Sequence, residues 1–516
     1  MHRPTRRATS ALVLAAAFVG GGLATAPAAR AAEHVITAVG ISFPVADITI
    51  AEGDSLTFVN LDGPIPHDVT SGTPNDDPGG DFSSETVIAT GSPTPVNGVE
   101  ALASGTYEFF CTVHPEQMTG TLTVEGGEGD QIPVPVPVLP EAPLDGVVSV
   151  GSLVPTPTSI TAHDPGDGER LYVASWAAGI IFEVTLAEGV PLTASPYATG
   201  LSSPLGVAFG PGGILYVADS HPAPAGSSRT VVGRVTAFPP GGGDLATAGG
   251  IVVDNLPNGR HNTNGMEVRG GRLFVTNGNS TDDGVEGGEP ELPLSGTLIS
   301  IDLASLPEGG HVLDAGAGTD PDGDEDGFRV EATGMRNDYD VAFDGDGDFW
   351  ITMNGLDMQD PYGEDLLLRG TPGGDVEDFG FPGCQYAAED TEPQQNTNPA
   401  VTDVCGADHV PPEALLGLHT SADGLAFGPS GEGRPWDGDI FVARFGNFFG
   451  TTPVGHDIVR VPIDGDGNVA GPPVTFLLGP APLDLTFGSE GMYVADFTGL
   501  ILFVPDEAGA LLLAGA

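Results

Sequence analysis

Short apolar segments separated by polar, Gly-rich turns recur from about residue 147 to residue 505. Each copy has a first apolar strand, a turn, a second apolar strand and then further strands. The first strands of the copies are residues 158–162, 205–209, 264–268, 339–343, 423–427 and 483–487. The second strands are residues 170–174, 214–218, 272–276, 348–352, 439–443 and 491–495. Six copies of such a unit, without helical periodicity, predict a six-bladed β-propeller. Longer spacing around the third to fifth copies predicts loop insertions that shape a binding face.

The first quarter of the chain has a different pattern, in which strands lead into potential metal ligands. The β-rich segments 56–60 and 105–110 precede His67 and Cys111, respectively. His114 and Met118 follow in the same loop, within F-F-C-T-V-H-P-E-Q-M-T-G. Two imidazoles, a thiolate and a thioether are the ligand set of copper sites that transfer single electrons. The alternative is a buried core thiol with the other three residues scattered by chance.

Residues 34–125 resemble the cupredoxins, particularly the plastocyanin and amicyanin-like proteins. The resemblance rests on the strand run 34–50, Gly53-Asp54, the P-H-x-V histidine and the C-x2-H-P loop. It implies an all-β, Greek-key β-sandwich that holds one type 1 copper through His67, Cys111, His114 and Met118.

Two features depart from that family. The gap of three residues between His114 and Met118 lies between the amicyanin-type and plastocyanin-type loops. Asp68 stands where the family often has an asparagine that ties the two ligand loops together. A carboxylate there predicts extra negative charge beside the copper and a lowered reduction potential.

The segments that flank this domain predict export and a tether. Residues 1–31 combine Arg3, Arg6 and Arg7, an apolar run at 11–23 and a small-x-small cleavage site, which predicts a signal peptide whose export route stays open. Residues 126–146 are acidic and Gly-rich and then alternate with proline, which favours an extended linker before the propeller of residues 147–505. No other apolar run is long enough to predict a membrane span. Outside the cytoplasm disulfides persist, so Cys384 and Cys405 are expected to pair.

The charge of the chain is strongly negative. The 16 basic residues are all arginine, and 71 acidic residues give a formal charge of -55. Removal of residues 1–31 takes away four arginines, which leaves 12 arginines against 71 acids and a charge of -59. Such a surface argues against binding nucleic acid or anionic lipid. It fits a protein of a salt-rich habitat or simply an acidic exported protein, and salt is expected to stabilise the fold by screening.

Three segments of the propeller resemble the soluble glucose and sorbosone dehydrogenases, six-bladed propellers that carry pyrroloquinoline quinone (PQQ). They are L-P-N-G-R-H at 256–261, T-G-M-R-N at 333–337 and G-F-P-G-C at 380–384. The resemblance implies that His261 is the catalytic base and that Arg336 and Asn337 contact the quinone. Arg444 would replace a lysine that the family often has, whereas Ala481 stands where the family commonly has an arginine.

Together these resemblances predict an exported protein in which the copper domain accepts electrons from a quinone-dependent sugar or alcohol dehydrogenase in the same chain. The partner would be a sugar or alcohol substrate or a redox protein. The alternative is a copper electron carrier with a non-enzymatic propeller that docks a partner, in which His261 and Arg336 are turn residues. Fold resemblance alone does not decide between them.

One acidic segment has the alternation of an oxygen-rich calcium loop. It comprises Asp320, Asp322, Asp324 and Asp326, with Glu331 as the last ligand. Neither register of a calcium loop is complete, and a solvated acidic loop is the alternative. Residues 344–348 and 464–466 are predicted to be turns that connect strands.

Overall fold

The computed structural model divides the chain into two compact units, Met1–Ala89 with Pro93–Gly129, and Thr90–Ser92 with Asp130–Ala516. The structure describes residues 33–38, 43, 47–51, 55–60, 66–73, 82–84, 86, 94–115, 117–125, 147–151, 153–187, 189–223, 230–286, 289–313, 327–357, 363–387, 393–406, 409–431, 434–446, 454–478 and 481–515. The predicted signal peptide, the predicted linker and Asp320 to Asp326 lie outside these residues.

The first unit consists of two sheets that enclose one apolar core. One sheet has the order β1 (Glu33–Ala38), β3 (Ser55–Asn60), β5 (Thr94–Pro95). The other has the order β2 (Asp47–Ala51), β7 (Thr119–Glu125), β6 (Gly105–Phe110), β4 (Thr70–Ser71), and a 3-10 turn spans Val99–Ala101. Phe58 of one sheet and Phe109 and Leu122 of the other are buried in the same cluster. The predicted β-sandwich is confirmed.

Strand pairing brings two distant segments of this unit together. β4 pairs with β6 in the register Thr70↔Phe110, so the segment just before β4 lies beside the residue that follows β6. β6 and β7 form an antiparallel pair that ends at Phe110↔Thr119. Residues 111–118 therefore form the loop at that end of the sheet, next to His67.

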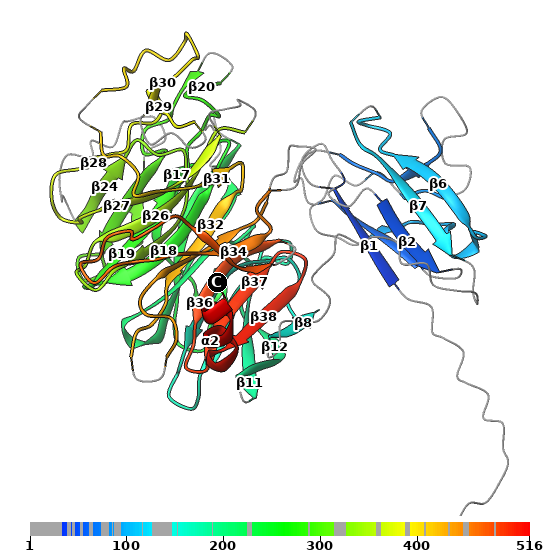
Figure 1. Ribbon diagram of the computed structural model, residues 1–516, viewed down its shortest axis with the longest axis horizontal. Coiled ribbons are helices and arrows are strands. Elements are labelled where there is room, and N and C mark those ends of the chain that lie inside the picture. Colours follow the sequence, from blue (N-terminus) through cyan, green and yellow to red (C-terminus); the bar gives the residue numbers. More distant parts are fainter. Residues whose placement is uncertain are drawn as a thin grey trace, which may run out of the picture. The chain divides into compact units, whose positions relative to one another are not determined.

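The second unit is a β-propeller (Figure 1). Its first three blades each consist of five strands. They are β9 (Pro157–His163), β10 (Arg170–Ser175), β11 (Ile180–Ala187), β12 (Val190–Thr199) and β16 (Gly243–Asp244); β13 (Gly206–Gly210), β14 (Ile214–Pro222), β15 (Val231–Phe238), β17 (Gly250–Pro257) and β23 (His311–Val312); and β18 (Thr263–Arg269), β19 (Arg272–Asn277), β22 (Thr297–Asp302), β24 (Phe328–Thr333) and β28 (Glu377–Asp378).

The last three blades have four strands each. They are β25 (Asn337–Phe343), β26 (Phe349–Asn354), β27 (Glu364–Gly370) and β31 (Ala414–Leu418); β32 (Ala422–Phe427), β33 (Ile440–Arg444), β34 (Asp457–Val461) and β35 (Val474–Leu478); and β36 (Pro482–Phe487), β37 (Gly491–Asp496), β38 (Leu500–Pro505) and β8 (Val148–Gly151). The predicted first and second strands of all six repeats coincide with the two innermost strands of these blades. The six-bladed propeller is confirmed.

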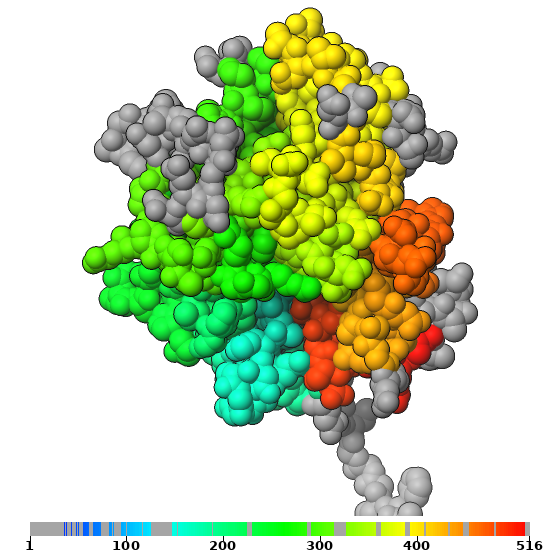
Figure 2. All heavy atoms as spheres, turned by 90° about the vertical axis from the view of Figure 1, so that its left-hand side faces the viewer, coloured from blue at the N-terminus to red at the C-terminus, as the bar shows by residue number. Residues whose placement is uncertain are grey.

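The sixth blade closes the ring, because its fourth strand comes from the start of the propeller. β8 pairs with β38 in the register Ile501↔Val150, more than 340 residues along the chain. Figure 2 shows the colours running round the unit, with the cyan first blade beside the red last blade. Carboxylates link neighbouring inner strands across the ring: Asp484 accepts the Ile160 N–H (2.8 Å), and Asp340 accepts the Leu425 N–H (3.0 Å).

Smaller elements complete the described part of this unit. Two hairpins lie in the long insertions of blades 3 and 4: β20 (Val285–Glu286) with β21 (Glu289–Pro290), and β29 (Cys384–Gln385) with β30 (Gln394–Gln395). The helices are α1 (Leu245–Ala248) and α2 (Asp506–Gly515), with a 3-10 turn at Pro211–Gly213. Among the described residues, no helix has the length and apolar character needed to cross a bilayer.

Local contacts confirm two of the sequence predictions. The Cys384–Cys405 disulfide forms between the β29–β30 insertion and the segment after it. The acidic segments 344–348 and 464–466 are turns, because Asp344 accepts the N–H groups of Asp346, Gly347 and Asp348, and Asp464 accepts those of Asp466 and Asn468.

Candidate metal centre and propeller pocket

Three predicted ligand atoms meet at one end of the first unit. Cys111 Sγ lies 3.7 Å from His67 Nδ1 and 3.9 Å from His114 Nδ1, and the two nitrogens are 3.2 Å apart. The point equidistant from these three atoms lies about 2.1 Å from each, a distance that suits metal–nitrogen and metal–sulfur bonds. The residues therefore fit a trigonal His2Cys metal site.

Hydrogen bonds within the 111–118 loop hold two of these ligands and Met118. The Cys111 N–H donates to the Met118 carbonyl (2.9 Å), and the His114 carbonyl accepts the Met118 N–H (3.0 Å). Cys111, His67 and Met118 are fully buried, and His114 is partly exposed. Cys111 and Met118 belong to one apolar core cluster, so both ends of the loop bury their side chains in the same core. Burial keeps water from the ligands on all sides except that of His114.

Asp68 ties the two ligand loops together. Its carboxylate accepts the Thr112 N–H (2.7 Å) and the Thr112 hydroxyl (2.5 Å), so a residue next to His67 is fixed to the residue after Cys111. The hydroxyls of Thr86 (3.0 Å) and Thr70 (3.3 Å) donate to the same carboxylate. With only 2 % of Asp68 exposed, this negative charge is held close to the ligands.

The propeller has a cavity of about 330 Å³ on one face. It is lined by Arg260, His261, Arg336, Asn337, Asn354, Gly355, Leu356, Asp357, Asp365, His419, Ser421 and Gly446. The lining residues gather because adjacent strands of a blade are antiparallel: the start of an inner strand and the end of its neighbour lie on the same face. His261, Arg336 and Ser421 precede the inner strands β18, β25 and β32, whereas Asn354 ends β26 and Gly446 follows β33.

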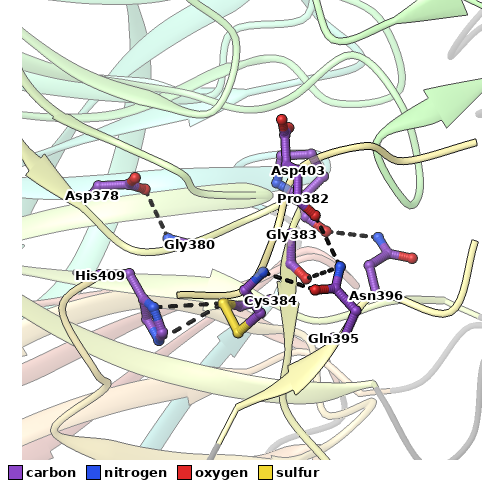
Figure 3. The surroundings of a disulfide bond; sticks show 10 residues. Asp378, Gly380, Pro382, Gly383, Cys384, Gln395, Asn396, Asp403 and His409 are labelled. Atoms are coloured by element: carbon purple, nitrogen blue, oxygen red, sulfur yellow. Dashed lines mark hydrogen bonds between the residues drawn. A yellow bond between two sulfur atoms is a disulfide. The ribbon is translucent and has the colours of Figure 1, made fainter. Parts of the chain in front are cut away.

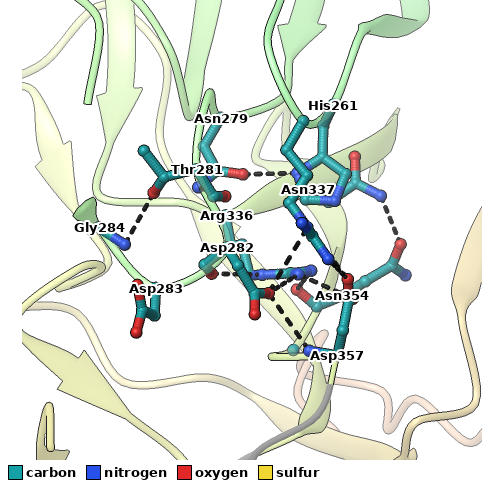
Figure 4. A network of polar contacts seen from close by, with 12 residues as sticks. His261, Asn279, Thr281, Asp282, Asp283, Gly284, Arg336, Asn337, Asn354 and Asp357 are labelled. Carbon is teal, nitrogen blue, oxygen red and sulfur yellow. Dashed lines mark hydrogen bonds and ion pairs between the residues drawn. The ribbon is translucent and has the colours of Figure 1, made fainter. Parts of the chain in front are cut away.

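A chain of polar groups fixes His261 (Figure 4). Asn279 Nδ2 donates to the Thr281 carbonyl (2.7 Å) and to Glu291 Oε1 (2.8 Å), both of which can only accept. The amide oxygen of Asn279 therefore faces His261 Nδ1, 2.6 Å away, and must accept a hydrogen bond from it. This orientation assigns the hydrogen to Nδ1 and leaves the lone pair on Nε2.

Glu291 anchors this chain, because its carboxylate also accepts the Ser280 N–H and hydroxyl (both 2.8 Å) and the Ser295 hydroxyl (2.7 Å). Burial, together with the positive charge of Arg336, lowers the pKa of His261 to about 3. The imidazole is thus neutral at physiological pH and can accept a proton at Nε2.

Two arginines of the pocket are paired with two carboxylates (Figure 4). Arg336, of which 1 % is exposed, donates from Nη2 to Asp357 (2.8 Å) and to the Asp282 carboxylate, and from Nε to the Asp282 carbonyl (2.9 Å). Arg260 also pairs with Asp357, with Nε 3.1 Å from the carboxylate. Burial opposes ionisation of Asp357, but Arg336 and Arg260 outweigh it and lower its pKa to about 2. The two guanidinium charges are therefore largely compensated within the protein.

Side-chain amides join blades 3, 4 and 5 at the wall of the pocket. Asn264 Nδ2 donates to Asn337 Oδ1 (3.1 Å), Asn337 Nδ2 donates to Asn354 Oδ1 (2.5 Å), and Asn354 Nδ2 donates to the Ala422 carbonyl (2.8 Å). Each amide is oriented by its neighbour, which fixes Asn337 at the wall. Asp365 faces the pocket from β27, and burial raises its pKa.

The structure brings His261, Arg336 and Asn337 together in one pocket. Arg444 is not among the described lining residues; it binds Asp457 through Nε (2.7 Å) and Nη2 (2.6 Å) and the Leu416 carbonyl through Nη1 (2.8 Å). Ala481 is buried at the start of blade 6.

Glu331, the one described member of the predicted calcium loop, lies in β24 and is buried. It accepts the Ser300 hydroxyl (2.5 Å) and the Gly373 N–H (2.8 Å). Its oxygens are therefore already hydrogen-bonded within the protein, and its role as a calcium ligand remains a prediction.

Sequence reasoning missed several residues of the site. Asn279, Asp282 and Glu291 lie in the blade 3 insertion, and Asp357 lies in the loop that follows β26. The cluster of polar residues 277–283 directly after a buried strand was the available signal, since such positions lie at a blade end. The contact of Asp282 with Arg336 spans 54 residues and that of Asp357 with Arg260 spans 97 residues, which no local pattern reveals.

Comparisons with known proteins agree with the division of the chain into two compact units. Residues 10–124 match the family described as cupredoxin-like domain. A calcium structure of Trichoderma reesei Carbohydrate-Active Enzymes Family AA12 is 19 % identical, with a TM-score of 0.52, over 69 % of this chain and 95 % of that chain. The holo form of the pyranose dehydrogenase PQQ domain from Coprinopsis cinerea is 17 % identical, with a TM-score of 0.52, over 70 % of this chain and 96 % of that chain. No curated protein matches the chain. The chain thus combines a cupredoxin-like domain with a propeller that has the fold of PQQ-dependent sugar dehydrogenase domains.

Proposed function

We propose that this protein is an exported electron-transfer protein that holds a type 1 copper in its cupredoxin-like domain. The observation that carries the proposal is the triangle of His67 Nδ1, Cys111 Sγ and His114 Nδ1, whose size suits one ion. Copper is preferred because a thiolate and a nearby thioether are soft ligands. Bound there, copper would supply a one-electron acceptor.

Copper loading of the purified protein tests this proposal. Cu²⁺ is expected to produce an intense visible absorption from the Cys111 thiolate, and one copper should bind per chain. Cys111→Ser should remove that absorption and lower the bound copper. Cys111→Ser with unchanged absorption would contradict the assignment, and so would a metal-loaded native protein without the band.

We further propose that the propeller oxidises a sugar or alcohol with PQQ and passes the electrons to the copper domain. The pocket has the size of a small-molecule site, a neutral imidazole and a fixed Arg336–Asn337 pair. PQQ carries three carboxylates, and the arginines are already paired with Asp282 and Asp357, so charge balance calls for a divalent cation to enter with the quinone. With that cation, the residues fit the cofactor.

In the proposed reaction the quinone, when bound, would supply a two-electron acceptor. His261 would accept the hydroxyl proton of the substrate at Nε2, while Asn279 holds Nδ1. Arg336 and Asn337 would orient the ligand. A copper domain in the same chain raises the effective concentration of the electron acceptor, which is a physical reason for the fusion.

Calorimetric titration with PQQ, with and without Ca²⁺, tests this second proposal. Binding is expected only in the presence of the divalent cation, and Arg336→Gln should weaken it. His261→Gln should leave PQQ binding in place but abolish sugar-dependent reduction. Absence of PQQ binding under both conditions would contradict the proposal.

A second candidate function for the propeller is a non-enzymatic docking module. One observation favours it: Arg260, Arg336 and Arg444 are all compensated by carboxylates of the protein itself. The same titration separates the two functions, because a docking module would bind no quinone.

We also propose that residues 1–31 direct export, which is supported by their charged start, apolar centre and small-x-small site. Intact mass of protein recovered outside expressing cells should correspond to a chain that begins at Ala32. Recovery of the full-length chain only from the cytoplasm would contradict export.

A further inference from the structure

A second group of sulfur and nitrogen ligands lies far along the chain from the copper ligands, in the blade 4 insertion (Figure 3). The Sγ atoms of Cys384 and Cys405 and one ring nitrogen of His409 all lie within 4.8 Å of one another. Cys384 Sγ is 3.6 Å from His409 Nδ1 and 3.8 Å from Nε2. The two sulfurs are joined in a disulfide, so the group cannot bind a metal in this state.

Besides the disulfide, several hydrogen bonds hold the two cysteine segments together. Gln395 pairs with Cys384 in the β29–β30 hairpin, and its Oε1 accepts the Cys405 N–H (2.9 Å). Its Nε2 donates to the carbonyls of Asp403 (2.9 Å) and Gly383 (3.3 Å), on either side of the disulfide. Gln395 therefore keeps the two segments adjacent without help from the S–S bond.

Hydrogen bonds also hold the segment that carries His409. The Val410 N–H donates to the Asp378 carbonyl (2.7 Å), and the Asp378 carboxylate accepts the Gly380 N–H (2.9 Å). Gly380 lies directly against the group: a Cβ at this position would come within 3.0 Å of Cys384 Sγ and 3.1 Å of His409 Cγ, and its φ is +91°. The backbone around Gly380 thus lies against Cys384 and His409 on one side.

Access from solvent is provided at Cys405. Only 5 % of Cys384 is exposed, whereas Cys405 is partly exposed beside Val404, of which 81 % is exposed. A thiolate from solvent can therefore reach the Cys405 sulfur in preference to that of Cys384, since thiol exchange depends on access.

We propose that reduction of this disulfide by a dithiol creates a Cys2His site for one thiolate-preferring cation such as Zn²⁺ or Cu⁺. One thiolate of the reductant attacks Cys405 Sγ, the S–S bond breaks, and the electron pair leaves on Cys384 Sγ. The second thiol of the reductant then displaces Cys405, so that the reductant is oxidised to its disulfide. The cation binds both sulfurs and the imidazole of His409 and releases the thiol protons. Two thiolates and one imidazole are a familiar donor set for such cations, with a remaining position for water.

Cobalt binding in the full chain with Cys111→Ser tests the proposal, because that variant lacks the copper-site thiol. The protein is reduced with a dithiol, desalted without air and titrated with Co²⁺. The reduced protein should bind one Co²⁺ with thiolate-to-metal absorption, and the oxidised protein should not show this absorption. Adding Cys384→Ser and Cys405→Ser should abolish it.

His409→Ala in the same background identifies the third ligand. It should weaken Co²⁺ binding by about tenfold or more, since removal of even a supporting group of a metal site costs that much. His163→Ala, which removes a histidine stacked on Phe209 instead, is the matched control and should bind as before. Melting temperatures of the oxidised variants confirm that each is folded. If the reduced Cys111→Ser protein has two free thiols but shows no thiolate-to-cobalt absorption, the proposal is overturned. If the His409→Ala protein binds Co²⁺ as tightly as its parent, His409 is not a ligand.

Discussion

The carboxylate of Asp68 can be replaced by an amide to test its effect on the candidate copper site. Asp68→Asn keeps the residue's shape, and the hydroxyls of Thr112 and Thr86 can turn to accept from the new amide. Removal of a buried negative charge near the copper favours the reduced ion. We expect the reduction potential to rise by tens of millivolts, and at most on the order of 100 mV from Coulomb's law at an effective dielectric constant near 20.

Protein-film voltammetry of the two copper-loaded proteins measures this difference. Thr112→Ser, which keeps both donors to Asp68, should leave the potential nearly unchanged and serves as the control. An Asp68→Asn protein with an unchanged or lower potential would show that this charge does not act on the copper.

Asn279 controls the proton of His261 in the same local manner. Asn279→Leu removes the acceptor for Nδ1–H, so the imidazole should become a mixture of tautomers. Asn279→Asp adds a negative charge beside the ring and should raise the pKa of His261 from about 3 by roughly one to two pH units. The ¹⁵N chemical shifts of the ring nitrogens, followed against pH, report both effects. Identical shifts in the native and Asn279→Leu proteins would contradict the tautomer assignment.

At the scale of elements, sequence patterns predicted the inner half of each blade and little of the outer half. Strands β10 and β14 each contain a run of four buried apolar residues, 171–174 and 215–218, so their pattern is strong. The pairing of β8 with β38 was not predicted, because Val148–Gly151 is short, alternately exposed and finds its partner only once the ring closes. The edge strands β16, β23 and β28 are each two residues long and carry no periodic signal.

The candidate sites also differ in how far a local sequence pattern reveals them. The meeting of His67, Cys111 and His114 was predictable because two of them share one loop after a strong strand. The group around His261 was only partly predictable, because Asp282 of the blade 3 insertion and Arg336 of blade 4 meet only through the packing of neighbouring blades. Arg444 looked available in the sequence, but β33 and β34 pair it with Asp457 in register.

Closure of the ring by β8 can be tested by removing it. Deletion of residues 147–151 should expose the edge of β38 and cost on the order of 2–4 kcal/mol, about 1 kcal/mol for each lost backbone hydrogen bond. Deletion of five residues within 126–146 is the control of equal length. Urea unfolding measures both, and equal stability of the two deletions would show that β8 does not hold the ring closed.

At the scale of the whole molecule, buried acids make stability depend on pH. Burial raises the pKa of Glu267 and that of Asp484 to about 7. It also raises the pKa of Asp340 well above the ordinary value of an aspartate. A carboxyl with a raised folded-state pKa is protonated in the fold, so its stabilisation is complete below pH 4 and is lost as the pH rises through 7. Between about pH 4 and pH 7, the free energy of unfolding should fall by about 1.4 kcal/mol per pH unit for each such group.

Urea unfolding at intervals from pH 5 to pH 7.5 checks this dependence. Glu267→Gln keeps an acceptor for the Phe343 N–H and should make the fall with pH shallower. Unchanged slopes in this variant would show that Glu267 does not titrate in that range.

The proposed function requires that one chain oxidise a sugar and pass the electrons to its own copper. Stopped-flow absorption of the protein loaded with copper, PQQ and Ca²⁺, after mixing with sugar, tests it most directly. We expect the visible copper band to bleach with a rate constant independent of protein concentration, because donor and acceptor are tethered. A protein with both cofactors bound whose copper band stays unchanged after sugar is added would contradict it.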